Sequence, residues 1–158
     1  MQLVFLLLLV VGPFFLLTGG WVPAAKLDRI TRARVGLSLF FAFAALGHFI
    51  WTEEMSRMLP PSFSFRVELI YITGVLELLG AIGVWIPSLT RLTGICLILL
   101  LVGVLPANIY SAISYVDFGG HASGPVYLLL RVPFQLFLIW WTYWATEQNW
   151  FSARARAA

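Results

Sequence analysis

The stretch that most constrains the fold is Arg66–Ile86, an apolar run that carries one carboxylate, Glu77, near its middle. A helix rises about 1.5 Å per residue, so about 20 apolar residues cross the hydrocarbon core of a bilayer. A charged side chain at the centre of such a helix costs about 2.5–3.5 kcal/mol on insertion scales. We therefore expect Glu77 to face the interior of a helical bundle, where it has a partner or a function.

The composition is that of an integral membrane protein. Hydrophobic residues make up 61% of the 158 residues and charged residues 11%, whereas soluble domains are about 45–50% apolar. The one cysteine, Cys96, lies in an apolar run, which excludes an internal disulfide and a cysteine metal cluster. The sequence predicts a multi-pass, all-α protein of a bacterial-type plasma membrane (inner membrane), with no room for a soluble catalytic domain.

Five apolar segments predict five membrane spans. The first, 1–20, is interpreted as an N-terminal transmembrane helix or an uncleaved signal-like segment. A basic cytoplasmic loop at 21–34 follows it, and a cytoplasmic tail at 147–158 ends the chain. The other four spans are expected at about 35–51, 66–86, 92–109 and 126–145, and a short amphipathic piece is expected at 53–59.

The distribution of basic residues predicts the orientation of these spans. Two basic residues, Arg57 and Arg66, fall on the side predicted to be outside. Seven fall on the other side: Lys26, Arg29, Arg32, Arg34, Arg91, Arg154 and Arg156. Because cytoplasmic loops carry an excess of Lys and Arg, this asymmetry predicts an N-out, C-in topology. Basic residues dispersed over loops do not form a nucleic-acid surface, so the expected surroundings are the lipid bilayer and other membrane proteins.

In this topology the charged residues within the membrane share the outer leaflet. Glu77 and Arg131 differ by about 8 Å in predicted depth, so we expect them to form an ion pair. Gln135 lies one turn from Arg131 on the same helix face, whereas Glu68 and Glu77 lie on opposite faces of theirs. The candidate pocket and ion-pair residues are Glu77, Arg131, Gln135, His48, Asn108, Glu68, Tyr71 and Tyr110.

Two interpretations of these residues stay open. In the first, Glu77 and Arg131 form a buried pair that fixes helix register, and Gln135 and Asn108 complete its hydrogen bonds. In the second, they line an outward-facing pocket, with His48 at its mouth, for a small polar or amphipathic ligand such as a quinone headgroup. The two histidines have no carboxylate at metal-ligand spacing, so we expect no metal site.

A series of short motifs resembles a known family. The motifs are Gly47-His48-Phe49, Met58 with Pro60, Gly74-Val75-Leu76-Glu77, Pro87, Pro106-Ala107-Asn108, and Arg131 with Gln135. In this order the chain, over about 34–144, is similar to the DoxX-like family of small integral membrane proteins. The resemblance implies a four-helix membrane core, here 35–146, to which the N-terminal span is an addition. It also implies a link to quinones, since the family takes its name from a subunit of a thiosulfate:quinone oxidoreductase, although this chain lacks the cysteine pairs of redox-associated relatives.

The functional expectation follows from the pocket. We expect a helical bundle that binds a small lipid-soluble ligand or supports a partner membrane protein or a second copy, and that is not an enzyme by itself. A quinone is the candidate cofactor. Two alternatives are kept: a membrane subunit of a quinone-linked oxidoreductase, and a proton-coupled transporter in which Glu77 titrates.

Overall fold

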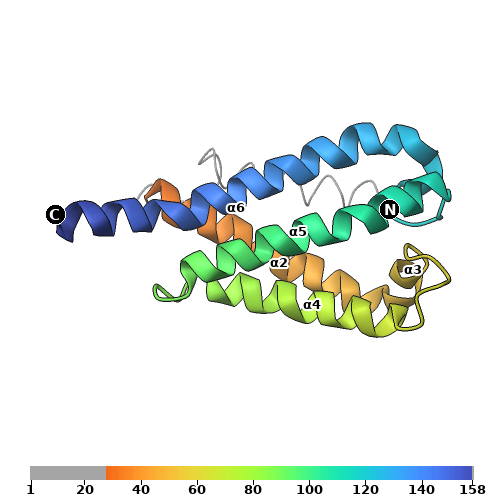
Figure 1. Cartoon of the computed structure of the whole chain (residues 1–158), viewed down its shortest axis with the longest axis horizontal. Helices are drawn as coiled ribbons and strands as arrows, with labels where there is room; N and C mark the ends of the chain where they lie inside the picture. The colour runs from red at the N-terminus through yellow and green to blue at the C-terminus, as the bar shows by residue number, and fades with distance from the viewer. Residues whose placement is uncertain (1–27, 158) are drawn as a thin grey trace.

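The computed structural model describes residues 28–157, with side-chain surroundings described as far as Glu147. Helices and turns account for this part of the chain, and no strand occurs in it. The N-terminal span predicted at 1–20 lies outside the described residues. The elements are α2 (Arg29–Ile50), α3 (Thr52–Ser56), α4 (Arg66–Gly83), α5 (Thr90–Ile113), the 3₁₀ helix η2 (His121–Tyr127) and α6 (Leu128–Ala157) (Figure 1).

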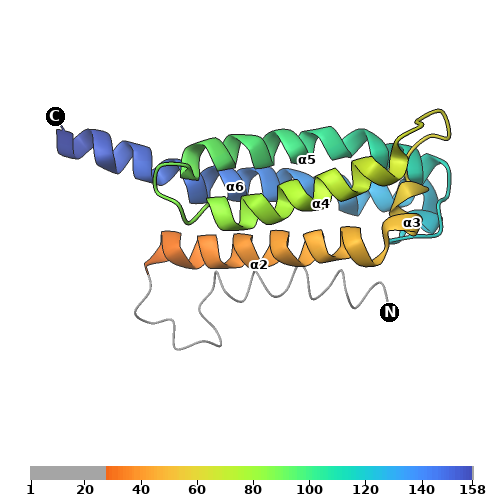
Figure 2. The ribbon, with the colours of Figure 1, turned by 90° about the horizontal axis from the view of Figure 1, so that it is seen from below.

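The four long helices form an up-down-up-down bundle. Short connections make consecutive helices antiparallel neighbours. The most extensive contacts are between α2 and α4 and between α5 and α6, and contacts of α2 with α6 and of α4 with α5 complete the bundle. One end carries α3 and η2, and we name it the α3 end; the turn between α4 and α5 lies at the opposite end, the α4–α5 end (Figures 1 and 2).

The helices support a membrane location in part. Three segments of the described chain are long and apolar enough to cross a membrane: Arg29–Ile50, Thr90–Ile113 and His121–Glu147. Helix α4 is the exception, because its 18 residues include three charged ones, Arg66, Glu68 and Glu77. The all-helical fold is confirmed, whereas the number of spans and their orientation stay predictions.

The ends of two helices differ from the expected boundaries. Helix α2 begins at Arg29, inside the segment predicted as a basic loop, because Asp28 caps it. The Asp28 carboxylate accepts the backbone N–H groups of Ile30 and Thr31 at 3.1 and 3.2 Å, and the Thr31 hydroxyl, its strongest partner, holds the pKa of this carboxyl below its usual value. Helix α6 continues to Ala157 through the predicted tail, where no Gly or Pro interrupts it.

The segment between the spans predicted at about 92–109 and 126–145 is partly helical. Helix α5 extends to Ile113, and η2 begins at His121. Three glycines, Gly119, Gly120 and Gly124, have positive φ angles between 60° and 98°. Glycine tolerates this region without steric cost, so the chain reverses here in a short turn.

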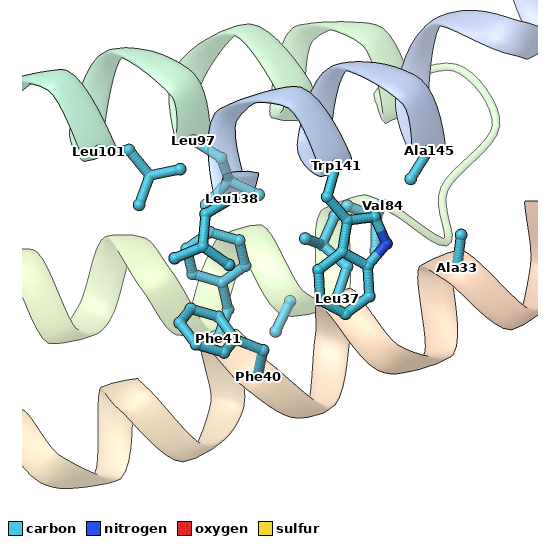
Figure 3. Close-up of a cluster of buried hydrophobic side chains, with 11 residues drawn as sticks. Ala33, Leu37, Phe40, Phe41, Val84, Leu97, Leu101, Leu138, Trp141 and Ala145 are labelled. Carbon is cyan, nitrogen blue, oxygen red and sulfur yellow. The ribbon is translucent and has the colours of Figure 1, made fainter. Parts of the chain in front are cut away.

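Buried apolar side chains fill the bundle interior mainly toward the α4–α5 end. Every long helix contributes to this cluster, and its largest fully buried member is Trp141. The cluster consists of Ala33, Leu37, Phe40, Phe41, Ala81, Val84, Leu97, Leu101, Leu138, Trp141 and Ala145 (Figure 3). We name it the apolar core. It ends where the polar side chains of the next section begin.

Helices α5 and α6 approach closely at Gly94, which gives a first prediction. A Cβ added to Gly94 would lie 2.7 Å from the Cβ of Thr146, whereas one added to Gly103 has nothing within 4 Å. Gly94→Ala is expected to lower the free energy of unfolding by about 1–3 kcal/mol through overpacking. Gly103→Ala, on the same helix, is expected to leave it unchanged or raise it by up to about 1 kcal/mol. Reversible unfolding in mixed SDS micelles measures both, and equal effects would contradict the tight α5–α6 contact.

Candidate functional site

Polar side chains from all four long helices occupy the bundle interior toward the α3 end. His48 comes from α2, Glu77 from α4, Asn108 from α5, and Arg131 and Gln135 from α6. Glu77, Asn108 and Gln135 are buried, and His48 and Arg131 are half-buried. We name these five residues the polar layer. The interior of the bundle therefore changes from apolar to polar along its axis.

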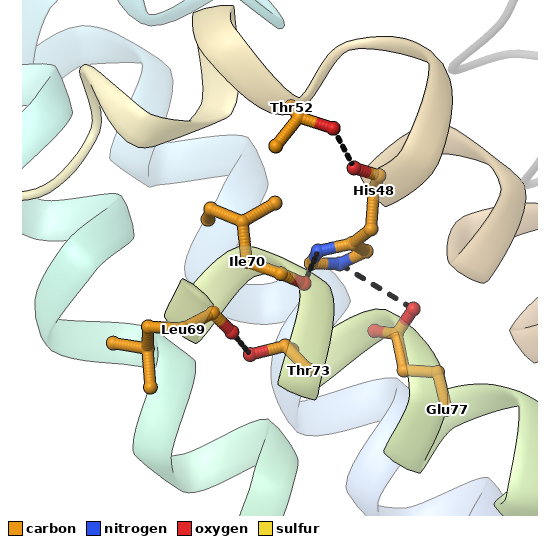
Figure 4. Close-up of polar contacts among 6 residues, drawn as sticks. All are labelled: His48, Thr52, Leu69, Ile70, Thr73 and Glu77. Atoms are coloured by element: carbon orange, nitrogen blue, oxygen red, sulfur yellow. Dashed lines mark hydrogen bonds and ion pairs between the residues drawn. The ribbon is translucent and has the colours of Figure 1, made fainter. Parts of the chain in front are cut away.

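His48 and Glu77 face each other in this layer at ion-pair distance. The Nε2 atom of His48 lies 3.5 Å from Oε2 of Glu77, and its Nδ1 atom lies 3.1 Å from the carbonyl oxygen of Ile70 (Figure 4). A Cβ added to Gly74 would lie 2.7 Å from the Cβ of His48. Ile70, Gly74 and Glu77 follow the i, i+4, i+7 spacing of one helix face. This face of α4 is therefore shaped around the imidazole.

The pairing of Glu77 differs from the expected one. Within the described chain, no ion pair joins Glu77 to Arg131. Arg131 instead donates from Nε to Oδ1 of Asn108 at 3.2 Å, although Glu77 is near enough to interact with it electrostatically. The reason is the packing of α4, whose most extensive contact is with α2, so the carboxylate meets His48 first.

The two amides of the polar layer bind the backbone of α5. The side chain of Asn108 donates from Nδ2 to the carbonyl of Val104 at 2.9 Å, and Nε2 of Gln135 donates to the carbonyl of Leu101. Pro106 lies inside this part of α5 and supplies no N–H, so the helix ladder is interrupted here. The carbonyl that loses its helix donor at Pro106 is that of Val102, so the amides bind carbonyls on either side of this interruption and do not replace the lost bond.

Two acceptor atoms in the polar layer have no donor. Oε2 of Glu77 and Oε1 of Gln135 are buried and without a hydrogen-bond partner. The 3.5 Å distance to His48 lies within ion-pair range but is longer than a normal hydrogen bond. Most buried polar atoms in proteins are hydrogen-bonded, so each exception calls for an explanation.

Three predicted residues lie apart from these contacts. Glu68 is exposed in the first turn of α4, on a different face from Glu77. Tyr71 is 44% exposed and packs against Phe49 with ring centroids 5.9 Å apart. Tyr110 is half-buried in α5. Glu68, Tyr71 and Tyr110 therefore lie outside the polar layer.

One residue between the last two predicted spans, near the α3 end, is buried. His121 is 3% exposed, its Nδ1 lies 2.7 Å from the carbonyl oxygen of Phe118, and its ring meets Tyr127 edge-on at 4.6 Å. The segment is a short 3₁₀ helix after a glycine turn, so no helical periodicity in the sequence marked His121 as an interior residue. No group of three metal-binding side chains occurs among the residues described.

One family model matches a part of the chain that includes the whole polar layer. A family model described as a domain of unknown function, DUF8561, matches residues 37–146, well over half of the chain. The chain belongs to the DUF8561 family. The matched range runs from α2 into α6 and contains His48, Glu77, Asn108, Arg131 and Gln135. No curated protein and no solved structure matches the chain.

Proposed function

We propose that this DUF8561 protein is a multi-pass plasma-membrane protein whose polar layer binds the headgroup of a small lipid-soluble ligand. In this proposal α2, α4, α5 and α6 all span the bilayer, the N-terminal segment adds a fifth span, and the topology is N-out, C-in. The polar layer then lies in the outer leaflet. Three helices of sufficient length and apolarity support the membrane location.

Helix α4 qualifies as a span despite its charges. Its 18 residues rise about 27 Å, which is close to the thickness of the hydrocarbon core. Arg66 and Glu68 lie in its first turn, where long side chains reach the interface. Glu77 is buried against α2 and away from lipid. The charges of α4 are therefore compatible with a transmembrane position.

The positions of basic residues support the orientation. Arg34 and Arg91 lie at the α4–α5 end, where Arg34 donates to the carbonyl of Ala145 and Arg91 pairs with Glu147 at 3.2 Å. Arg57 and Arg66 lie at the α3 end. With the positive-inside rule, the α4–α5 end faces the cytoplasm and the α3 end faces outward.

The observation that carries the ligand proposal is the pair of buried acceptors without donors, Oε2 of Glu77 and Oε1 of Gln135. Leaving such an atom unpaired costs about 1–3 kcal/mol, and a hydroxyl on a ligand removes this cost. The guanidinium of Arg131, which donates to Asn108 and interacts electrostatically with Glu77, suits a carbonyl or other acceptor on the same ligand.

These requirements describe an amphipathic molecule with hydroxyl or carbonyl groups on an apolar body. A quinone or quinol headgroup has this chemistry, and the resemblance to the DoxX-like family, which stays a prediction, agrees with it. A partner membrane protein or a second copy that places a polar side chain in the layer is the other expected role. A quinone-linked oxidoreductase subunit would need a redox partner as well.

Gentle purification from native membranes tests the ligand proposal. We expect mass spectrometry and an absorption spectrum of the solvent extract to reveal one lipid-soluble compound in stoichiometric amount. Arg131→Gln and Glu77→Gln should reduce it about tenfold or more, equivalent to about 1.4 kcal/mol of binding free energy. Glu68→Gln, an exposed carboxylate on the same helix, is the matched control and should retain it.

The same experiment can contradict the proposal. An identical lipid extract from wild type, both layer variants and the control would show that the polar layer does not hold the compound. A stoichiometric partner protein in place of a small molecule would favour the supporting role over ligand binding.

A further inference from the structure

We infer that His48 and Glu77 together form a binding site for one proton, which exchanges with the aqueous phase at the α3 end. This goes beyond the proposed ligand, because the proton site consists of protein atoms alone. The inference depends on three features of the pair: the hydrogen-bond partner of Nδ1, the atom that faces Nε2, and the surroundings on either side.

The first feature determines which imidazole nitrogen carries a hydrogen. Nδ1 of His48 lies 3.1 Å from the carbonyl oxygen of Ile70. A carbonyl oxygen only accepts hydrogen bonds, so Nδ1 is the donor and carries the hydrogen. A neutral His48 therefore presents a lone pair at Nε2.

The second feature is the atom that this lone pair meets. Nε2 faces Oε2 of Glu77 at 3.5 Å, so without a further hydrogen two acceptors point at each other. One proton taken up from water turns this repulsive contact into an attractive one. The result is either an imidazolium beside a carboxylate or an imidazole beside a carboxylic acid, and both forms contain the same single proton. No electron is transferred, and no other bond is made or broken.

Arg131 on α6 is the third ionisable side chain of the polar layer, and it is near enough to Glu77 to interact with it electrostatically. With the proton the polar layer carries one positive charge, and without it the layer is neutral, since the charges of Arg131 and Glu77 cancel.

Other ionisable groups near this end are accounted for by their burial or their partners. On or beside α3 they are Glu53, Glu54 and Arg57, all exposed, with Glu53 paired to Arg57. On the long helices they are Arg66, half-buried on α4, Glu68 and Tyr71, exposed on α4, and Tyr110, half-buried on α5. In and before η2 they are Tyr115 and Asp117, both exposed, and His121 and Tyr127, whose rings pack on each other. None of these makes an ion pair or hydrogen bond with His48 or Glu77 in the described chain.

The third feature limits exchange to one side. The side chains of His48 and Glu77 are 13% and 11% exposed, and His48 lies in the last turn of α2, shortly before α3. Toward the other end the interior is closed by the apolar core, including Phe41, Leu101 and Leu138. The pair is therefore a terminal proton site, reached from the α3 end, and not one step of a path across the membrane.

Acid-minus-alkaline infrared difference spectra of the protein in lipid membranes test this inference. In the wild type we expect imidazole and carboxyl bands to change together over one pH interval, as a single step. Glu77→Gln should abolish the carboxyl change that accompanies the imidazole bands and move the imidazole step. His48→Gln should move the remaining carboxyl step by about one pH unit or more. Glu68→Gln should leave the wild-type step in place.

Two results would overturn the inference. One is a wild-type spectrum with no pH step in which imidazole and carboxyl bands change together, a criterion that needs no variant and so does not depend on variant folding. The other is a carboxyl step assigned to Glu77 that keeps its position in His48→Gln. Neither result bears on the lipid extract, so failure of the proton site and failure of the ligand proposal are distinguishable.

Discussion

Replacing Glu77 by Gln is expected to lower the free energy of unfolding by about 3–5 kcal/mol. Glu77 is the one buried carboxylate among the residues whose burial is described. Its removal leaves Arg131 without a counter-charge in the interior and Nε2 of His48 without its ion-pair partner. Reversible unfolding in mixed SDS micelles measures the loss. Glu68→Gln, exposed on the same helix, should stay within about 0.5 kcal/mol of wild type.

The double variant tests whether the charges of Glu77 and Arg131 balance each other without direct contact. Arg131→Gln alone is also expected to destabilise, because Asn108 loses its donor and Glu77 its counter-charge. Combined, the two changes should recover about 0.5–3 kcal/mol relative to the sum of the single losses. Strictly additive losses would mean that the two side chains act independently.

The second large effect is expected at Trp141, which is 1% exposed in the apolar core. Trp141→Ala should lower the free energy of unfolding by about 3–5 kcal/mol through the cavity that it leaves. In lipid this cost comes from lost van der Waals packing, since the hydrophobic effect does not drive helices together there. The ring packs on Phe137 with centroids 5.7 Å apart.

Trp140, the preceding residue, supplies the matched control. It is 56% exposed and stacks on Trp144 at 6.2 Å, on the outer surface of α6. Trp140→Ala is expected to cost less than about 1 kcal/mol under the same conditions, because lipid replaces the contacts of an exposed ring. If the two variants unfolded alike, α6 would not be oriented with Trp141 toward the core.

Much of the helical architecture could be predicted from local features. The long apolar runs around Glu77 and Asn108 contain enough residues to cross a bilayer, and the structure has helices α4 and α5 there. The ends of the helices were harder to predict. Asp28 begins α2 within a basic segment, because its side chain caps the helix and Arg is itself a good helix former.

The residues of the polar layer could be predicted from the sequence, but most of the contacts between them could not. The high cost of a charge in lipid indicated an interior position for Glu77, and the structure buries it. His48 was expected only at the mouth of a pocket. Its place against Glu77 depends on Gly74, which leaves room for the ring between α2 and α4.

The sequence by itself determined that this chain is helical, that its helices suit a membrane, and that Glu77 needs a polar environment. These properties follow from segment length, apolarity and the cost of a buried charge, which are local. Tertiary structure alone decided that Glu77 meets His48 while Arg131 binds Asn108. That choice depends on which helices pack face to face, and packing is a property of residues far apart in the chain.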